Sequence, residues 1–460
     1  MIRTDNKLNP DDLSGKLDRF WELSGRKIEL IEKQYDESKG SPVFTAAGKY
    51  TARGWTEWTQ GFQYGSAILQ YDATGEKQFL ESARNRIVKV MAPHLSHTGV
   101  HDHGFNNLST YGNLLRLMHE GKIPDNEWEQ EFYELALKVS GAVQASRWTA
   151  LKNGGFIYSF NGPHSLFVDT IRSCRSLIIS HLIGHILMGE GDLRINLLER
   201  ALKHMETTAI WSVYYGEGRD TYDVRGRTAH ECIFNVKDGS FRSPGSQQGY
   251  SAFSTWTRGL AWAVCGFAEL LEWIDAAGQA GINLPDNLTD SETLALKAAT
   301  ATSDFYILNT PVDGVPYWDT DAPLLYRMGD YLNKPSDPFN GFEPVDSSAA
   351  AIASQGLLRL GTFLKNKGKE TDGNRYWQAG LTTVNTLLEK PYLSLKPDHQ
   401  GLLLHTVYHR PQGWDYIPAG SKIPNGESGM WGDYHIREVC LYLQHIINKE
   451  NYLTFFNGII

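Results

Sequence analysis

Apolar residues recur along the chain at helical spacing, and the segments that carry them are of two kinds. Six segments consist largely of small and apolar residues and are expected to be buried on most sides. They span residues 58–71, 108–118, 168–188, 256–273, 347–364 and 431–447. Six others have one apolar and one charged face. They span residues 17–35, 78–91, 127–143, 195–207, 292–308 and 374–388. No run of alternating strand type competes with this helical pattern.

The two kinds of segment alternate along the chain, which predicts a succession of two-helix hairpins. Six hairpins close into an (α/α)6 barrel whose inner helices surround a central cavity. An open solenoid is the other arrangement, but the loops are uneven and no strict repeat period is present. The sequence therefore predicts an all-α fold, a six-hairpin toroid. It forms one domain over residues 1–460, with a short polar extension at about residues 1–12.

The longer connections carry most of the glycine, aspartate, histidine and aromatic residues outside the helices. They span residues 94–107, 148–168, 209–255, 309–346 and 396–431. Loops of this length within a compact domain usually carry function. We expect them to form the rim of the barrel at one end. There the inner helices begin, and helix N-termini favour anions.

Composition narrows the class of partner. Hydrophobic residues make up 41% and charged residues 21% of the chain, as in soluble globular proteins. A net charge of −9 without a basic run argues against nucleic acid. The 13 Trp, 22 Tyr and 19 Phe fit carbohydrate stacking as well as core packing. The chain contains no run of 18 apolar residues, so no membrane span is predicted. The polar N-terminus lacks the apolar core of a signal peptide. A cytoplasmic or periplasmic location is expected. The four cysteines form no CxxC pair and are expected to be buried free thiols.

The segment that ends at Trp262 predicts a binding site for an anion. Ser254 and Thr255 are good N-cap residues before an apolar helix. Arg258 and Trp262 are four residues apart, so they share one face of its first turns. A guanidinium holds a carboxylate with two hydrogen bonds, and an indole offers a flat apolar face to a ring. The alternative is an Arg–Trp packing pair at a helix end.

Two aspartates are candidates for acid–base chemistry. Asp169 stands in an apolar lead-in to a buried helix, where loss of hydration disfavours the charged form. A second carboxylate nearby would raise its pKa further and make it a general acid near neutral pH. The alternative is an N-cap for the helix at Ile171. Asp102 precedes another buried helix and is either a partner of Asp169 or an ordinary cap or turn residue.

Histidines and tryptophans in the loops add candidates for substrate binding. His230 lies in a loop and either donates to a substrate oxygen or braces a turn. Trp55 and Trp58 either stack on a sugar or pack in the core. A metal is considered because four histidines gather between residues 94 and 103. Their spacing matches no dependable ligand pattern, so no metal and no cofactor is expected.

Seven short motifs follow one another along the chain. His230 lies eighteen residues before Gln248, which opens the fourth motif. In order the motifs are Trp58-Thr59-Gln60-Gly61-Phe62, His101 to Phe105, Val168-Asp169, Gln248 to Trp262, Gly314 to Asp319, Asp346 to Ala350, and Trp431 to Tyr434. Over nearly its whole length the chain resembles the unsaturated glucuronyl hydrolases of glycoside hydrolase family 88.

This resemblance implies an (α/α)6 barrel that acts on the 4,5-unsaturated uronic acid left by polysaccharide lyases at a non-reducing end. The enzyme hydrates the C4=C5 vinyl ether. Asp169 would protonate C4 and then activate the water that adds at C5. The hemiketal then opens and releases the remaining sugar chain. Asp102 would adjust the pKa of Asp169 and hold a substrate hydroxyl. The binding residues it implies are His101, His230, Gln248, Arg258, Trp262 and Trp58.

The chain departs from the family pattern beyond the first sugar ring. Phe160 stands where family members often carry a stacking tryptophan, and Gln63 stands where a tryptophan often follows Gly-Phe. Ser428, in the last long loop, is a candidate for binding the next sugar. The polysaccharide, its linkage, any sulfate it carries and the oligomeric state, monomer or dimer, stay open at this point.

Other functions compatible with the same residues remain. One is a hydrolase of the family 105 kind, which acts on rhamnose-linked substrates from pectin or ulvan. Another is a dehydratase or epimerase of the same fold that acts on saturated sugars. A third is a carbohydrate-binding barrel without activity, which the presence of Asp102, Asp169 and His230 does not favour. For the unsaturated glucuronyl hydrolase activity, the expected substrate is a small anionic oligosaccharide.

Overall fold

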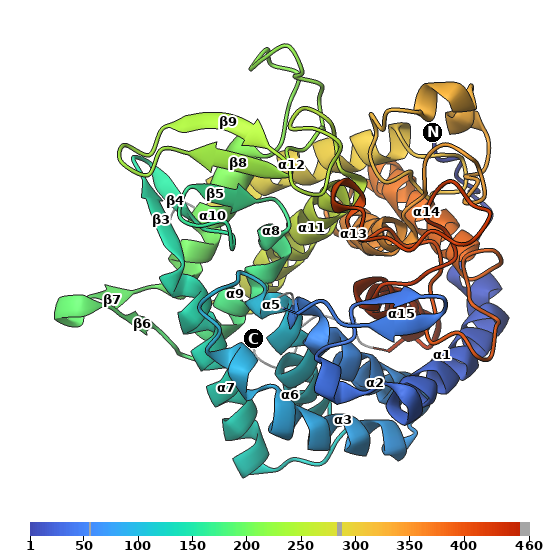
Figure 1. Ribbon diagram of the computed structural model, residues 1–460. Helices are drawn as coiled ribbons and strands as arrows, with labels where there is room; N and C mark the ends of the chain where they lie inside the picture. Colours follow the sequence, from blue (N-terminus) through green and yellow to red (C-terminus); the bar gives the residue numbers. More distant parts are fainter. Residues whose placement is uncertain (55–56, 283–287, 451–460) are drawn as a thin grey trace.

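The computed structural model describes residues 1–54, 57–282 and 288–450. Trp55 lies outside these residues. The described helices form a double ring (Figure 1). The inner ring consists of α2 (Gln60–Thr74), α6 (Asn113–His119), α9 (Arg175–Leu182), α11 (Thr257–Gln279), α13 (Ser347–Asn366) and α15 (Met430–Ile447). The outer ring consists of α1 (Ser14–Gln34), α3 (Lys77–Val90), α7 (Glu127–Ser146), α10 (Leu197–Trp211), α12 (Leu288–Leu308) and α14 (Glu370–Leu387).

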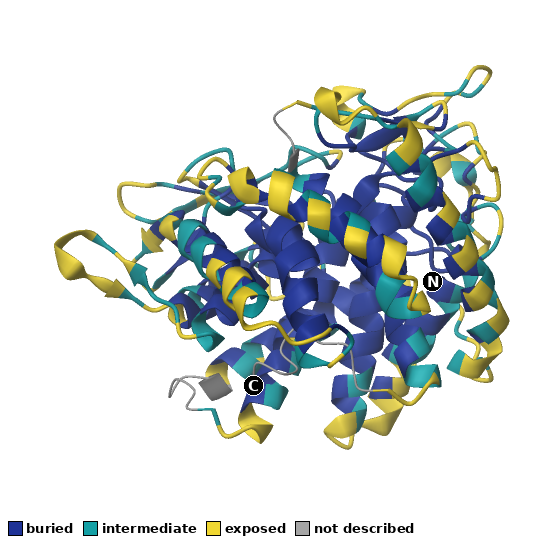
Figure 2. Cartoon of the chain, turned by 90° about the horizontal axis from the view of Figure 1, so that it is seen from below, coloured by how far each residue is buried: buried dark blue, intermediate teal, exposed yellow. Residues whose placement is uncertain are grey.

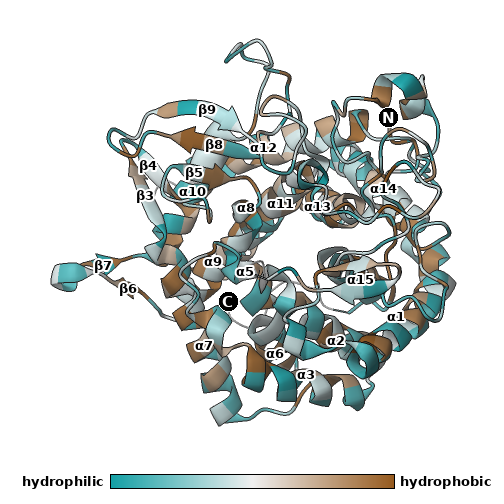
Figure 3. Cartoon of the chain, in the orientation of Figure 1, coloured by the Kyte–Doolittle hydropathy of each residue, from teal (hydrophilic) through white to brown (hydrophobic). Residues whose placement is uncertain are grey.

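Burial follows the sequence pattern. The inner helices are buried along most of their length, whereas the outer helices expose one side to solvent (Figure 2). The outer helices also carry hydrophilic and hydrophobic residues on different faces (Figure 3). Each outer helix buries its apolar face against the inner ring, because that removes apolar surface from water. The predicted all-α, (α/α)6 barrel is confirmed.

Short elements precede some inner helices and fill the loops. Two inner helices have a one-turn lead: α5 (His103–Asn107), which continues through a π-helical turn (Leu108–Gly112) into α6, and α8 (Thr170–Ser173), which precedes α9. The other short helices are α4 (Ala92–Leu95), η1 (Pro10–Leu13), η2 (Glu37–Lys39), η3 (Glu57–Thr59), η5 (Glu190–Asp192), η6 (Leu325–Met328), η7 (Tyr331–Asn333) and η8 (Arg410–Gln412).

The loops also form small antiparallel sheets, which the sequence pattern did not indicate. The pairs are β1 (Phe44–Ala46) with β2 (Lys49–Thr51), β3 (Trp148–Leu151) with β4 (Gly154–Ile157), and β6 (Leu187–Met188) with β7 (Arg194–Ile195). A three-stranded sheet has the order β5 (Ser165–Phe167), β8 (Glu231–Phe234), β9 (Phe241–Gly245). The helix predicted over residues 168–188 was too long: it ends at Leu182, and Leu187–Met188 belongs to a projecting ribbon (Figure 1).

The three-stranded sheet brings two candidate residues to the rim of the barrel. Phe167 of β5 pairs with Glu231 of β8. One residue further on, the Val168 amide donates to the His230 carbonyl oxygen at 2.9 Å. Asp169 and His230 are distant in sequence, but they therefore lie close to each other at the end of this strand pair.

Two glycines lie where neighbouring helices approach each other closely. A Cβ at Gly61 would stand 2.5 Å from the Asn106 Cα, which no packed structure tolerates. A Cβ at Gly356 would stand 2.6 Å from the Cys265 Cα. These contacts hold α2 against α5 and α13 against α11. Glycine is needed there for space rather than for an unusual backbone angle.

The N-terminal residues lie against the barrel. The Ile2 side chain is buried, and its amide donates to the Ile307 carbonyl oxygen at 3.0 Å. The four cysteines are buried free thiols, as predicted. Among the helices of the described segments, none combines the length and the apolar character needed to cross a membrane.

Candidate active site

A cavity of about 590 Å³ opens where the inner helices begin. Its wall contains most of the residues that the sequence singled out, contributed by segments far apart in the chain. These are Trp58, His101, Asp102, Phe160, Asp169, Gln248, Arg258 and Trp262. The volume falls in the range of small-molecule sites. The cavity is therefore the candidate active site.

Asp102 and Asp169 face the same histidine. The His101 Nε2 lies 3.3 Å from Asp169 Oδ1 and 3.9 Å from Asp102 Oδ1. Each aspartate stands at the N-cap position of a one-turn helix, but neither carboxylate makes a capping hydrogen bond. Both carboxylates are thus free of the structural role considered for them, and they form a compact Asp–His–Asp unit.

Burial and charge separate the two carboxylates. Burial raises the pKa of Asp102 above its ordinary value, with His101 opposing and Asp169 adding to the rise. Burial also raises the pKa of Asp169, but the close contact with His101 and its charge, together with the charge of Arg258, outweigh it. The pKa of Asp169 is therefore lowered. The predicted rise for Asp169 was wrong, because the sequence does not show that a histidine lies between the carboxylates.

His101 itself is shifted towards its charged form. Burial lowers its pKa, but the charge of Asp102 and the close contact with the charge of Asp169 more than compensate and raise it. The three groups lie so close together that the charge of each one shifts the pKa of the others, and they titrate as a coupled unit.

Arg258 is anchored by the protein before any ligand arrives. Its Nη1 donates to Asp346 Oδ2 at 3.1 Å and to the Val407 carbonyl oxygen. Its Nη2 donates to Gln248 Oε1 at 2.7 Å and to the Tyr408 carbonyl oxygen at 2.8 Å. These bonds use the donors of both terminal nitrogens. Arg258 therefore supplies a fixed positive charge and orients Gln248, whose amide NH2 group stays a donor.

The helix that carries Arg258 begins later than predicted. Its N-cap is Trp256, without a capping hydrogen bond, and Ser254 instead donates to Asp319 Oδ2 at 2.8 Å. The N-cap prediction for Ser254 and Thr255 was wrong, because Trp256 still has extended backbone angles.

Arg258 and Trp262 both line the cavity but pack on different partners. The Arg258 guanidinium lies between two rings, with its Cζ 4.7 Å from the centre of Trp256 and 4.8 Å from that of Trp431. The Trp262 ring packs on Phe105, with their centres 4.9 Å apart. The flat face predicted for a sugar ring is thus held by an aromatic cluster.

His230 lies behind the wall rather than in it. Its ring is held between Phe167 and Trp256, each with its centre 4.6 Å away. Its Nδ1 accepts a hydrogen bond from the Gln247 amide at 3.1 Å, so it braces the turn before Gln248. Its Nε2 is buried without a hydrogen-bond partner. Burial lowers the pKa of His230 to about 4, so the ring is neutral.

The remaining predicted residues divide between the cavity and the core. The Phe160 ring stacks on His101, with centres 5.9 Å apart, and the Trp58 ring stacks on Trp431 at 5.3 Å. Ser428 is a correction. It is fully buried, and its hydroxyl oxygen lies 2.7 Å from both the Leu403 carbonyl oxygen and Asp433 Oδ1, which share its one proton. The Ser428 hydroxyl thus holds the loop together, and Ser428 is not part of the cavity wall.

The sequence reading missed one side of the cavity. This outer wall consists of Tyr408, His409, Pro411, Gln412 and Trp414. Asp415 holds it in place by accepting the His409 amide at 3.1 Å and the Tyr408 amide at 2.5 Å. The one signal was the length of the loop at 396–431. Ser246, Gln247 and Trp256, adjacent to predicted residues, also line the cavity. Within the described part of the chain, no three His, Cys, Asp or Glu side chains gather as a metal site would require.

Comparison with known proteins gives relatives over most of the chain. The chain is 26% identical over 396 residues to an unsaturated glucuronyl hydrolase of Formosa agariphila, covering 85% of this chain and 81% of that protein. It is 26% identical over 409 residues to an unsaturated glucuronyl hydrolase of Bacillus sp. (strain GL1), covering 87% and 90%. It is 23% identical over 450 residues to an unsaturated chondroitin disaccharide hydrolase of Streptococcus pyogenes, covering 94% and 92%. No family model matches the chain.

Solved structures share the fold. The unsaturated glucuronyl hydrolase of Bacillus sp. GL1 superposes with a TM-score of 0.66 at 21% identity, over 93% of this chain and 95% of that one. An unsaturated glucuronyl hydrolase specific for heparin superposes with a TM-score of 0.70 at 19% identity, over 96% and 100%. Sequence relatives of one kind over most of the chain, together with a barrel of the same architecture, confirm the resemblance of this chain to the unsaturated glucuronyl hydrolases of glycoside hydrolase family 88.

Proposed function

We propose that the protein is a glycoside hydrolase that removes a 4,5-unsaturated uronic acid from the non-reducing end of lyase-generated oligosaccharides. The observation that carries this proposal is the Asp102–His101–Asp169 unit in the wall of the cavity, which the fixed positive charge of Arg258 also lines. The named activities of the sequence relatives support it.

Binding uses the wall that Arg258 organises. The substrate carboxylate accepts a hydrogen bond from the Gln248 amide, whose oxygen is already held by Arg258. The buried charge of Arg258 attracts the same carboxylate in a site of low dielectric constant. The unsaturated ring lies against Trp262, because an apolar ring face packs well on an indole.

The reaction begins with proton transfer to C4 from the Asp169 carboxyl. The two π electrons of the C4=C5 bond form the new C4–H bond, and the positive charge is shared between C5 and the ring oxygen. Water then adds at C5 and gives its proton to the Asp169 carboxylate. The hemiketal at C5 opens to a ketone, and the hemiacetal left at C1 releases the remaining sugar chain.

The low pKa of Asp169 in the empty site is compatible with this role. The substrate brings a negative carboxylate into the cavity and displaces water. Both changes disfavour a second negative charge, so the Asp169 pKa rises when substrate is bound. His101, in contact with both carboxylates, moves the proton between Asp102 and Asp169. Asp102, whose pKa is raised, is the reserve from which that proton comes.

Ultraviolet absorbance tests the proposal directly. The substrates are unsaturated disaccharides made by lyases from chondroitin, heparin, gellan or xanthan, and ulvan. Hydration of the C4=C5 bond removes the chromophore, so we expect the absorbance to fall with at least one of them. An unchanged signal with every substrate would contradict the proposal. A new band with saturated sugars would indicate dehydration instead.

A further inference from the structure

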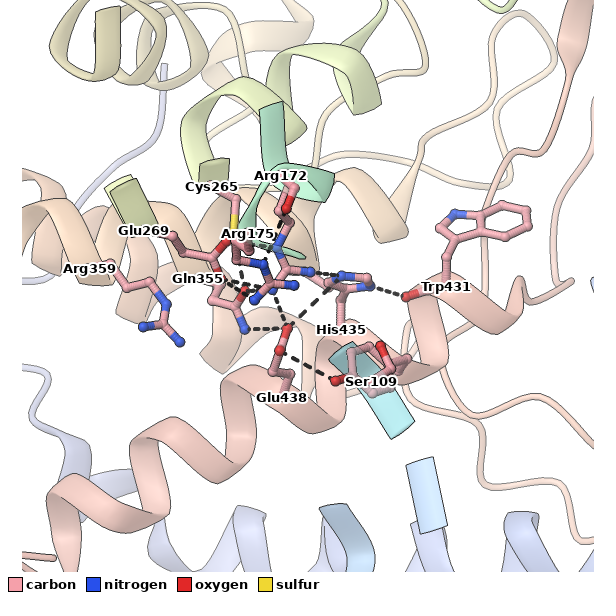
Figure 4. A network of polar contacts seen from close by, with 12 residues as sticks. Ser109, Arg172, Arg175, Cys265, Glu269, Gln355, Arg359, Trp431, His435 and Glu438 are labelled. Carbon is pink, nitrogen blue, oxygen red and sulfur yellow. Dashed lines mark hydrogen bonds and ion pairs between the residues drawn. The ribbon is translucent and has the colours of Figure 1, made fainter. Parts of the chain in front are cut away.

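Buried polar side chains form a network of contacts among the helices (Figure 4). We call it the Arg172 network, and it brings together side chains from α8, α9, α11, α13 and α15. Its members are Arg172, Arg175, Glu269, Gln355, His435 and Glu438. All are buried, and the Arg172 side chain is 0% exposed. Two arginines balance two glutamates, so the cluster carries no net charge when His435 is neutral.

Arg172 is the centre of this cluster. Its Nε and Nη2 form a fork on Glu269, with distances of 3.1 and 2.9 Å to the two carboxylate oxygens. Nη2 also donates to Gln355 Oε1 at 2.9 Å and to Glu438 Oε2 at 2.6 Å. Nη1 lies against His435 Nε2. One guanidinium therefore ties α8 to three inner helices.

Such a network is poorly explained by stability alone. Taking two arginines and two glutamates out of water is costly, and apolar side chains of similar volume often stabilise a core as well or better. A planar guanidinium also orients its surroundings, because it holds several hydrogen-bond partners at set angles. The position of Arg172 in the chain indicates that the backbone of α8 is held in this way.

Arg172 lies one helical turn after Asp169. The Arg172 amide donates to the Asp169 carbonyl oxygen at 3.1 Å. Between them the helix is a single short turn, α8, and Asp169 makes no capping hydrogen bond with its side chain. The place of the Asp169 carboxylate thus depends on how the backbone of α8 is anchored. The hydrogen bond of Val168 to the sheet anchors α8 before its first residue, and the Arg172 network anchors it near its last residue.

The network also adjoins the cavity wall. The Arg172 Cζ lies 5.9 Å from the centre of the Trp262 ring, and the His435 ring meets Trp262 edge-on at 4.9 Å. The Trp262 ring also packs on the Phe105 ring. Arg172 is therefore joined to Asp169 through the backbone of α8, while its guanidinium lies beside the ring-binding face.

We propose that Arg172 is a positioning residue for the reaction, which holds α8 so that the Asp169 carboxylate keeps its place beside His101. This inference rests on the proposed hydrolysis of unsaturated uronic acids. Arg172 touches no substrate. It acts through Asp169, and its loss lowers kcat more than it changes substrate binding.

The test compares two arginines that have the same kind of buried ion pair. Arg172→Lys keeps the positive charge but loses the fork, because one ammonium group cannot serve Glu269, Gln355 and Glu438 in the same plane. The control is Arg359→Lys. Arg359 Nη1 donates to Glu272 Oε2 at 2.6 Å, one turn further along α11 from the cavity than Glu269. Each variant is examined for folding by circular dichroism and for kcat and KM by loss of ultraviolet absorbance.

We expect kcat of Arg172→Lys to fall on the order of a hundredfold, as for a reacting group misplaced by about 1 Å. Its KM should change little. Arg359→Lys should lose a comparable part of its thermal stability while keeping the kcat of the parent protein. Equal kcat in the two variants would overturn the inference, since it would make the network structural only.

A second variant decides the matter if Arg172→Lys does not fold. Glu438→Gln keeps the size of the side chain and an oxygen for Arg172, and it removes one charge of the network. We expect a smaller fall in kcat with KM unchanged, and a parental kcat would overturn the inference. An unmodified protein that leaves every unsaturated substrate intact would instead contradict the proposed function, so the two failures are distinguishable.

Discussion

The amide nitrogen of Gly104 donates to the hydroxyl oxygen of Ser173 at 3.0 Å, and the backbones of α5 and α8 meet at this point. A Cβ at Gly104 would stand 2.6 Å from the Ser173 Cα. Each of these one-turn helices begins directly after an aspartate of the active site, Asp102 or Asp169. The close approach of the two helices is therefore what brings the two carboxylates to one histidine.

Gly104→Ala should damage the site and the fold together. The added methyl group must push α8 away from α5, and overpacking of this kind costs about 1–3 kcal/mol in the free energy of unfolding. Because the movement separates Asp102 from Asp169, kcat should fall as well. Urea denaturation and kinetics measure the two effects. Gly15→Ala is the control, since no atom lies within 4 Å of a Cβ there and it should leave kcat unchanged.

Asp169→Asn should keep the fold and remove turnover. The amide has the shape of the carboxyl group but neither protonates C4 nor accepts the proton of water. Loss of such a group typically costs roughly 10²–10⁴-fold in rate. The expected result is a native circular dichroism spectrum with kcat reduced by that factor. Activity close to that of the parent would remove Asp169 from the mechanism.

His101→Gln should move the basic limb of the pH profile. His101 is the main group that lowers the Asp169 pKa against the effect of burial. Without it the pKa of Asp169 rises, so the carboxyl group that protonates C4 keeps its proton to a higher pH in the free enzyme. The basic limb of kcat/KM is therefore expected at higher pH in the variant.

His103→Gln serves as the control for that shift. The His103 ring contacts the Ser140 hydroxyl at 3.1 Å and the His97 carbonyl oxygen at 2.9 Å, away from the carboxylates. Its basic limb should coincide with that of the parent protein. A limb that moves equally in both variants would contradict the role assigned to His101.

Arg258→Ala should weaken substrate binding and stability at once. The substitution removes the positive charge of the wall and the group that orients Gln248, so KM should rise. It also leaves the buried Asp346 carboxylate without its cation. Breaking a buried pair in this way costs about 3–5 kcal/mol in the free energy of unfolding.

Gln248→Ala separates the two effects of Arg258. It removes the proposed carboxylate donor but leaves Arg258 paired with Asp346. We expect KM to rise with little change in the urea midpoint. An unchanged KM in both variants would mean that the substrate carboxylate binds elsewhere in the cavity.

The sequence by itself determined the ring of helices and part of the cavity wall. Alternation of buried and amphipathic segments requires each outer helix to cover an inner one, which leads to the barrel. Arg258 and Trp262 face the same cavity because their spacing of four residues is local to one helix. The motifs and their order were also sufficient to reveal the resemblance to the unsaturated glucuronyl hydrolases.

The tertiary structure alone decided the electrostatics and the rest of the wall. Whether burial or charge sets the Asp169 pKa depends on His101, which a different loop brings to 3.3 Å. Ser428 proved to be a core residue, and Trp414 a cavity residue, although both belong to the same long loop. Spacing along a helix is dictated by local geometry. Contacts between loops depend on the packing of the whole barrel, and no local pattern in the sequence records them.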